Sequence, residues 1–236
     1  MTPRLVDRAP FHLETREVWR LLGYPPGRSR PTPLVIARIE EMLEESRALI
    51  DPRGCYTIKS LRETPADGPF RGADQIAYSV TTIGRRLEER VAELARRGET
   101  LRALVLDAIG SATVESVTDS INAEICRQVG QAGVFTNRRI SPGYRGWPIT
   151  AQTEIFELLP SRLSGVQLKP TFFMEPRKSI SAAISIGRHV AHSKYVSICA
   201  FCDRRDCAYR RERGTDWDES PHAAASASIA ARTPFR

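Results

Sequence analysis

The sequence has no apolar run long enough to cross a membrane, because none approaches the roughly 20 consecutive apolar residues that a spanning helix needs. Residues 1–8 lack the apolar segment of a secretion signal. The chain contains neither a Gly-x-Gly-x-x-Gly nor a Walker phosphate loop, and its four histidines, at positions 12, 189, 192 and 222, are too scattered for a Cys–His or Ser–His–Asp arrangement. These absences predict a cytoplasmic protein that binds no nucleotide by the common glycine-rich routes.

The composition is that of an ordinary globular protein. Of 236 residues, 41% are hydrophobic and 27% are charged, which is enough for one domain with a sizeable core and some appendages. The formal net charge of +7 favours an acidic partner without specifying nucleic acid. Three of the five cysteines are clustered, which is more typical of a metal site in a reducing compartment than of a disulfide scaffold.

Hydrophobic periodicity predicts an α+β fold. Apolar residues recur at helical spacing in five segments, 13–22, 34–50, 83–97, 100–128 and 151–159. Strands are expected at 56–61, 76–82, 166–168, 179–187 and 195–198. Helices and long loops between such strands indicate a single domain with a mixed or antiparallel sheet flanked by helices. In the longest helix, Gly110, Ser111 and Ala112 form a face without bulk, which predicts the close approach of another backbone.

Four segments follow from this pattern. Residues 1–33 would form an N-terminal helix and a proline-rich arm, and residues 34–198 the α+β core. Residues 199–213 carry the clustered cysteines. Residues 214–236 are rich in Asp, Ser and Ala, a composition that predicts a disordered tail.

The segment from Arg139 to Ile149 carries the most specific signal for a ligand. Arg139 offers a planar fork of donors that suits a carboxylate. Three residues later, Pro142 and Gly143 predict a tight turn whose main-chain groups are free to face a ligand, and Tyr144 adds an aromatic ring for stacking. An arginine, a turn and an aromatic together suit an amino-acid nucleotide.

The cysteine cluster carries the second signal. Cys199 and Cys202 form a Cys-x-x-Cys pair, and Cys207 follows five residues later, so three thiolates could close over one metal. Five arginines between residues 204 and 213 would lower the pKa of these thiols. An iron–sulfur cluster, a structural zinc and unligated thiols all remain open. Cys55 and Cys126 lie outside any ligand spacing and are expected to be buried and inert.

The run Arg139-x-x-x-Gly143-Tyr144 resembles the S-adenosylmethionine-binding motif of the reactivation domain of cobalamin-dependent methionine synthase. The resemblance extends over most of residues 10–210 and is specific mainly in 139–181, where it includes Gln152–Leu159 and Met174–Ser181. Stand-alone relatives of this domain carry a similar cysteine run near the C-terminus. The fold expected from the resemblance is that of the reactivation domain.

The resemblance implies a binding site for S-adenosylmethionine made by Arg139, Ser141, Gly143 and Tyr144. Arg139 would hold the carboxylate of the methionine part, and the Gly143–Tyr144 turn would meet the adenosine. Glu115 corresponds to an acidic residue that faces the ligand cleft in the family, and Lys178 is a second residue expected to line it. A solvated glutamate and a surface lysine are the alternatives.

The resemblance also implies a role and partners. In methionine synthase the domain holds S-adenosylmethionine over the cobalt of a separate cobalamin domain, and a low-potential donor such as a flavodoxin or ferredoxin supplies one electron. The present sequence contains no Asp-x-His-x-x-Gly motif for cobalt ligation. It would therefore act on a corrinoid-binding protein in trans, as the module of a split methionine synthase or of another corrinoid methyltransferase, and would not be catalytically complete alone.

A function of a different class is a basic, metal-stabilised nucleic-acid-binding protein. The net charge and the five arginines near the cysteines favour it. Against it, aromatic residues are not interleaved with the basic ones, so we do not expect nucleic acid to be the partner.

Overall fold

A five-stranded antiparallel sheet, with strand order β1-β2-β3-β7-β4, forms the centre of the fold. The computed structural model describes residues 2–24, 29–63, 65, 67–130, 134–137, 139–144 and 146–190. The strands of the sheet are β1 (Arg4–Asp7), β2 (Arg53–Ser60), β3 (Gln75–Thr82), β4 (Phe135–Thr136) and β7 (Ser179–Gly187). A second, two-stranded sheet pairs β5 (Gln167–Leu168) with β6 (Met174–Glu175).

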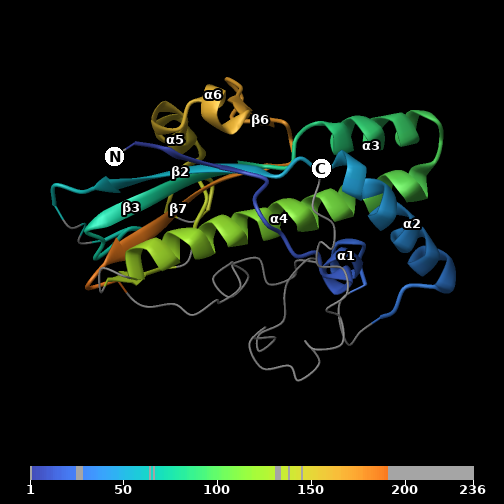
Figure 1. Cartoon of the computed structure of the whole chain (residues 1–236), viewed down its shortest axis with the longest axis horizontal. Coiled ribbons are helices and arrows are strands. Elements are labelled where there is room, and N and C mark those ends of the chain that lie inside the picture. Colours follow the sequence, from blue (N-terminus) through green and yellow to red (C-terminus); the bar gives the residue numbers. More distant parts are fainter. Residues whose placement is uncertain are drawn as a thin grey trace.

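Helices cover both faces of the five-stranded sheet. The helices of the described chain are α1 (Thr15–Leu21), α2 (Pro33–Leu49), α3 (Arg86–Arg96), α4 (Thr100–Gly130), α5 (Gln152–Leu158) and α6 (Ser161–Ser164), and a short 3-10 turn, η1 (Ile149–Ala151), leads into α5. Figure 1 shows α4 lying along one face of the sheet, with α5 and α6 on the other. The strands are therefore sandwiched between two helical layers.

The alternation of side chains along β3 explains why both faces are covered. Successive residues of a strand point to opposite faces, so Ala77 joins the hydrophobic cluster on the α4 side and Tyr78 joins the cluster on the α5 side. On the α4 side, the hydroxyls of Thr81 and Thr118 share a buried hydrogen bond of 2.6 Å. On the other side, the hydroxyl of Tyr78 donates to Glu154 of α5 at 3.3 Å.

Gly54 lets α4 come close to the sheet. A Cβ atom at this position would lie 2.8 Å from both Cδ1 and Cγ1 of Ile121, a fully buried residue of α4. Any larger residue at position 54 would therefore require the Ile121 side chain, the helix or the strand to shift.

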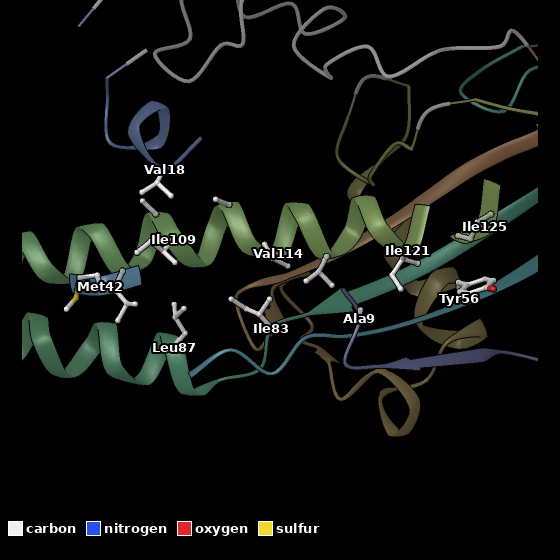
Figure 2. Close-up of a cluster of buried hydrophobic side chains, with 14 of the residues drawn as sticks. Ala9, Val18, Met42, Tyr56, Ile83, Leu87, Ile109, Val114, Ile121 and Ile125 are labelled. Atoms are coloured by element: carbon white, nitrogen blue, oxygen red, sulfur yellow. The ribbon is translucent and has the colours of Figure 1, made fainter. Parts of the chain in front are cut away.

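The long helix α4 extends beyond the sheet. Its 31 residues span about 46 Å, whereas the eight residues of β3 span about 27 Å. The overhanging part packs against α1, α2 and α3 (Figure 1). Figure 2 shows Val18 on one side of α4, and Met42 and Leu87 on the other. One continuous hydrophobic core thus runs from the three helices to the sheet.

The predicted fold class is confirmed: the structure is α+β with an antiparallel sheet flanked by helices. The predictions of the longest helix and of the 179–187 strand match α4 and β7 closely. The predicted strand 195–198 and the predicted tail 214–236 lie outside the described residues. Among the described residues, no helix has both the length and the apolar character needed to cross a membrane.

One packing prediction was wrong. A side chain, not another backbone, fills the space beside Gly110: a Cβ there would lie 2.6 Å from Cδ2 of Leu87. The side chain of Lys178 approaches the same position, with its Cε 3.4 Å away. Gly110 therefore makes room for α3 and for a lysine of the predicted cleft.

Candidate functional site

The backbone pairing of residues 135–137 and of Ile140 with β7 determines where Arg139 lies. Strand β4 pairs with the end of β7, and the N–H of Asn137 donates to the carbonyl of Ser185 at 2.9 Å. Ile140 then exchanges two hydrogen bonds with Ala183, of 2.9 and 2.8 Å. Arg139 is thus held at the edge of the sheet that runs beside α4.

The side chain of Arg139 reaches two carboxylates on α4. Its Nε donates to Oδ1 of Asp119 at 3.1 Å, and its Nη2 donates to Oε2 of Glu115. The arginine side chain is only 17% exposed, whereas those of Glu115 and Asp119 are 46% and 47% exposed. Burial by itself lowers the pKa of the guanidinium, but the two carboxylates outweigh that effect and raise the pKa. Arg139 is therefore firmly charged and oriented by two anchors.

Hydrogen bonds among Ser141, Gly143, Tyr144 and Trp147 close a turn that follows Arg139 in the sequence. The N–H of Tyr144 donates to the carbonyl of Ser141 at 3.2 Å. The N–H of Gly143 donates to the carbonyl of Trp147 at 2.8 Å, and the N–H of Trp147 donates to the carbonyl of Tyr144 at 2.9 Å. Gly143 has a φ of +93°, a value that favours glycine. The prediction of a tight turn is confirmed, but the prediction of free main-chain donors is wrong for Gly143 and Tyr144, because the turn itself uses both N–H groups.

The surface of the turn is apolar and partly open. Tyr144 is 45% exposed and Ile149 is 42% exposed. A Cβ at Gly143 would lie 3.4 Å from Cδ1 of Ile149, so the isoleucine packs directly against the turn. The segment that begins at Arg139 thus carries a charged group followed by an exposed aromatic ring and an exposed aliphatic side chain, a combination that suits a ligand with one flat and one zwitterionic end.

Lys178, the second predicted cleft residue, also contacts α4. Its Nζ lies 2.7 Å from Oδ1 of Asp107 and donates to Oγ of Ser111 at 2.8 Å. The lysine side chain is 14% exposed. Lys178 is thus a partner of α4 and not a loose surface residue.

A stripe of polar residues on α4 connects the two basic side chains. Its members recur every fourth residue and therefore lie along one side of the helix: Asp107, Ser111, Glu115 and Asp119. Lys178 binds the first two and Arg139 the last two. Sequence reasoning identified Glu115 but missed the other three, although their four-residue spacing was visible in the predicted helix.

The two described cysteines differ in exposure. Cys55 is fully buried in β2, and this burial raises the pKa of its thiol to about 12, so the expectation of an inert cysteine is supported. Cys126 is half-buried, so the prediction of a buried cysteine is wrong at this position, and its sulfur lies 3.2 Å from the hydroxyl of Thr136.

Cys199, Cys202 and Cys207 lie outside the described residues, as do the five arginines between residues 204 and 213. Within the described ranges, no group of three or more His, Cys, Asp or Glu residues is arranged to hold a metal ion. The metal centre therefore stays a prediction from the sequence, and the nucleic-acid hypothesis gains no structural observation.

Comparison with known proteins identifies a structural relative. No protein-family profile matches the sequence, and no curated protein matches it. Among solved structures, the chain is similar to that described as "Crystal Structure of the MetH Reactivation Domain bound to AdoHcy", with a TM-score of 0.63 and 14% sequence identity. The match covers 83% of this chain and 81% of that chain. At this identity the similarity establishes a shared fold.

Proposed function

We propose that this chain binds S-adenosylmethionine at the Arg139 ion pair and the Gly143–Tyr144 turn, and that it presents the methyl group to a cobalamin carried by another protein. The single observation that carries the proposal is an arginine side chain that is only 17% exposed, is held by two carboxylates, and lies five residues before a half-exposed tyrosine on a closed turn. The fold shared with a reactivation domain bound to AdoHcy supports the same ligand class.

Charge complementarity supports a nucleoside joined to an amino acid. Arg139 contributes one positive charge, and Glu115 and Asp119 contribute two negative charges, so the cluster is net negative. S-adenosylmethionine is net positive, because its sulfonium and ammonium groups outnumber its carboxylate. Arg139 would bind the carboxylate through its guanidinium fork, while Glu115 and Asp119 would attract the ammonium and the sulfonium.

The nucleoside end would lie over the turn. Tyr144 offers a ring face for the adenine, and Ile149 offers an aliphatic surface for the ribose or the base. Because Gly143 and Tyr144 use their N–H groups within the turn, the nucleoside would be recognised by shape and stacking more than by those backbone donors.

The reaction that this site would serve is a reductive methylation. An external low-potential donor supplies one electron to the cob(II)alamin of the partner, which becomes cob(I)alamin. The cobalt then attacks the methyl carbon, the carbon–sulfur bond breaks, and its electron pair remains on sulfur, so S-adenosylhomocysteine leaves. The role of this chain is to hold the sulfonium in line with the cobalt, which converts an encounter of two solutes into a positioned transfer.

The partner would be a separate corrinoid protein that carries the Asp-x-His-x-x-Gly motif. We favour a partner that belongs to a split methionine synthase, and the alternative is a partner that belongs to another corrinoid methyltransferase. Contact should be transient, because the corrinoid domain must also reach its ordinary methyl donor and acceptor, and a modest buried area is expected.

Reconstitution tests the proposal. The chain is mixed with a corrinoid protein in its cob(II)alamin state, S-adenosylmethionine and a low-potential reductant, and conversion to methylcobalamin is followed by absorption. We expect conversion with the wild type and with Arg127→Ala, which removes a 75% exposed arginine of α4, and much slower conversion with Arg139→Ala at S-adenosylmethionine concentrations that do not saturate the variant. Equal conversion without the chain would refute the proposed role.

A further inference from the structure

Two packed aromatic rings, those of Trp147 and Phe70, support the turn that carries Tyr144. The indole of Trp147 is only 8% exposed and belongs to the hydrophobic cluster between the sheet and α5. The ring of Phe70 packs edge-on against it, with centroids 5.0 Å apart and planes at 85°. This geometry is one that aromatic pairs prefer, so each ring restricts the other.

The backbone of Trp147 connects this support to the proposed ligand surface. Its carbonyl accepts the N–H of Gly143 at 2.8 Å, and its N–H donates to the carbonyl of Tyr144 at 2.9 Å. Any displacement of the Trp147 main chain must therefore move the Gly143–Tyr144 turn, and the packed indole restricts that main chain. Pro69 lies next to Gly146 as well, 3.9 Å from the position that a Cβ would take. The loop that carries Phe70 thus contacts the turn at two adjacent residues.

The loop between β2 and β3 provides a fixed base for Phe70. Three backbone hydrogen bonds close it on itself: Arg71 N–H to Gly68, Gly72 N–H to Pro65 and Ala73 N–H to Phe70, at 3.3, 3.0 and 3.0 Å. The carbonyl of Asp74, at the end of this loop, accepts the N–H of Leu61 at 2.9 Å. The phenyl ring is therefore presented by a compact loop and not by an extended one.

We infer that Phe70 and Trp147 are positioning residues for the S-adenosylmethionine site: they fix the Gly143–Tyr144 turn relative to Arg139 without touching the ligand. This inference rests on the proposed function. Two independent attachments set the ligand surface, the pairing of Ile140 with β7 on the arginine side and the Phe70–Trp147 contact on the tyrosine side. The affinity for the nucleoside end should depend on the second attachment.

Substitutions at Phe70 test the inference by calorimetric titration with S-adenosylhomocysteine. Phe70→Leu keeps apolar bulk but removes the edge-on ring contact, and it should weaken binding about three- to tenfold. Phe70→Tyr keeps the ring and should bind within about twofold of the wild type. Ile155→Val removes one methyl group from the same hydrophobic cluster and serves as the matched control for a general loss of packing. If Ile155→Val weakens binding as much as Phe70→Leu does, the positioning role is wrong.

Amide hydrogen exchange supplies a readout that needs no ligand. In Phe70→Leu, exchange of the bonded N–H groups of Gly143 and Trp147 should speed up about tenfold, while the amides around Ile121 in α4 keep their wild-type rates. Faster exchange in a protein that binds no S-adenosylhomocysteine would contradict the proposed function but retain the positioning of the turn. Unchanged exchange at Gly143 and Trp147 would overturn the positioning role, whether or not the wild type binds.

Discussion

Neutralising the carboxylates around Arg139 should reveal how strongly α4 holds this arginine. Glu115→Gln and Asp119→Asn each remove one charge and preserve the shape of the side chain. In each single variant Arg139 keeps one ionised partner, since the guanidinium contacts both carboxylates. In the double variant both carboxylate partners of Arg139 are neutral, while the arginine side chain, which is only 17% exposed, keeps its positive charge.

The expected magnitudes follow from the exposure of each group. An exposed ion pair contributes about 0–1 kcal/mol, and breaking a fully buried one costs about 3–5 kcal/mol. Glu115 and Asp119 are nearly half exposed, so solvent screens each contact, and each single variant should lose about 1 kcal/mol of unfolding free energy. The double variant should lose about 3 kcal/mol, more than the two single losses combined, because it alone removes both carboxylates that contact the guanidinium.

Urea denaturation measures these differences in unfolding free energy. The slope of the unfolding free energy against urea concentration should stay constant across the variants. Glu44→Gln is the matched control, because Glu44 pairs with Arg47 in α2 but both side chains are more than half exposed. That variant should change the unfolding free energy by less than about 0.5 kcal/mol. If the double variant is as stable as Glu44→Gln, the carboxylates do not hold Arg139 and the account of the site is wrong.

Three further predictions concern packing, protonation and metal. Gly54→Val should destabilise the protein by about 1–3 kcal/mol in urea denaturation, because the new side chain collides with Ile121; unchanged stability would contradict the close approach of α4. Folding raises the pKa of the Cys55 thiol from 9.0 to about 12, so the contribution of the protonated thiol to the unfolding free energy is complete below pH 9 and is lost as the pH rises toward 12. The melting temperature of the wild type should therefore fall relative to that of Cys55→Ala over this pH range. Parallel plots of melting temperature against pH for the two proteins would refute the burial of the thiol as the cause. Anaerobically purified protein should contain iron that is lost when any cysteine of the 199–207 cluster is replaced by Ser. Stoichiometric zinc would favour the structural-metal alternative, and the absence of both metals would favour the alternative of unligated thiols.

Periodic segments were predictable because the spacing of apolar residues within each segment is sufficient to indicate a helix or a strand. In α4, apolar residues recur at helical spacing over 31 residues, and in β7 a β-branched and small-residue run has clear limits. The strands β1, β4 and β6 were not predicted. They have four, two and two residues, and such short segments become strands only because a longer neighbour offers hydrogen bonds.

The site could be predicted only in part for the same reason. Arg139, Gly143 and Tyr144 stand out within one short run of sequence, and Glu115 follows from the family resemblance. The partnership of Arg139 with Asp119 depends on the pairing of Ile140 with Ala183, a contact between segments 43 residues apart. Likewise, no local pattern links Phe70 to Trp147, because their contact is made by two loops that meet only in the folded chain.

Calorimetric titration with two ligands tests the central claim most directly. S-adenosylhomocysteine carries both the nucleoside and the amino-acid end, whereas 5′-methylthioadenosine carries the nucleoside and thioether alone. The wild type should bind both. Arg139→Ala should weaken binding of S-adenosylhomocysteine by about 10- to 100-fold, because a charge-assisted pair with the carboxylate contributes roughly 1.5–3 kcal/mol, and should leave binding of 5′-methylthioadenosine unchanged. Equal affinity of wild type and Arg139→Ala for S-adenosylhomocysteine would contradict the proposed site.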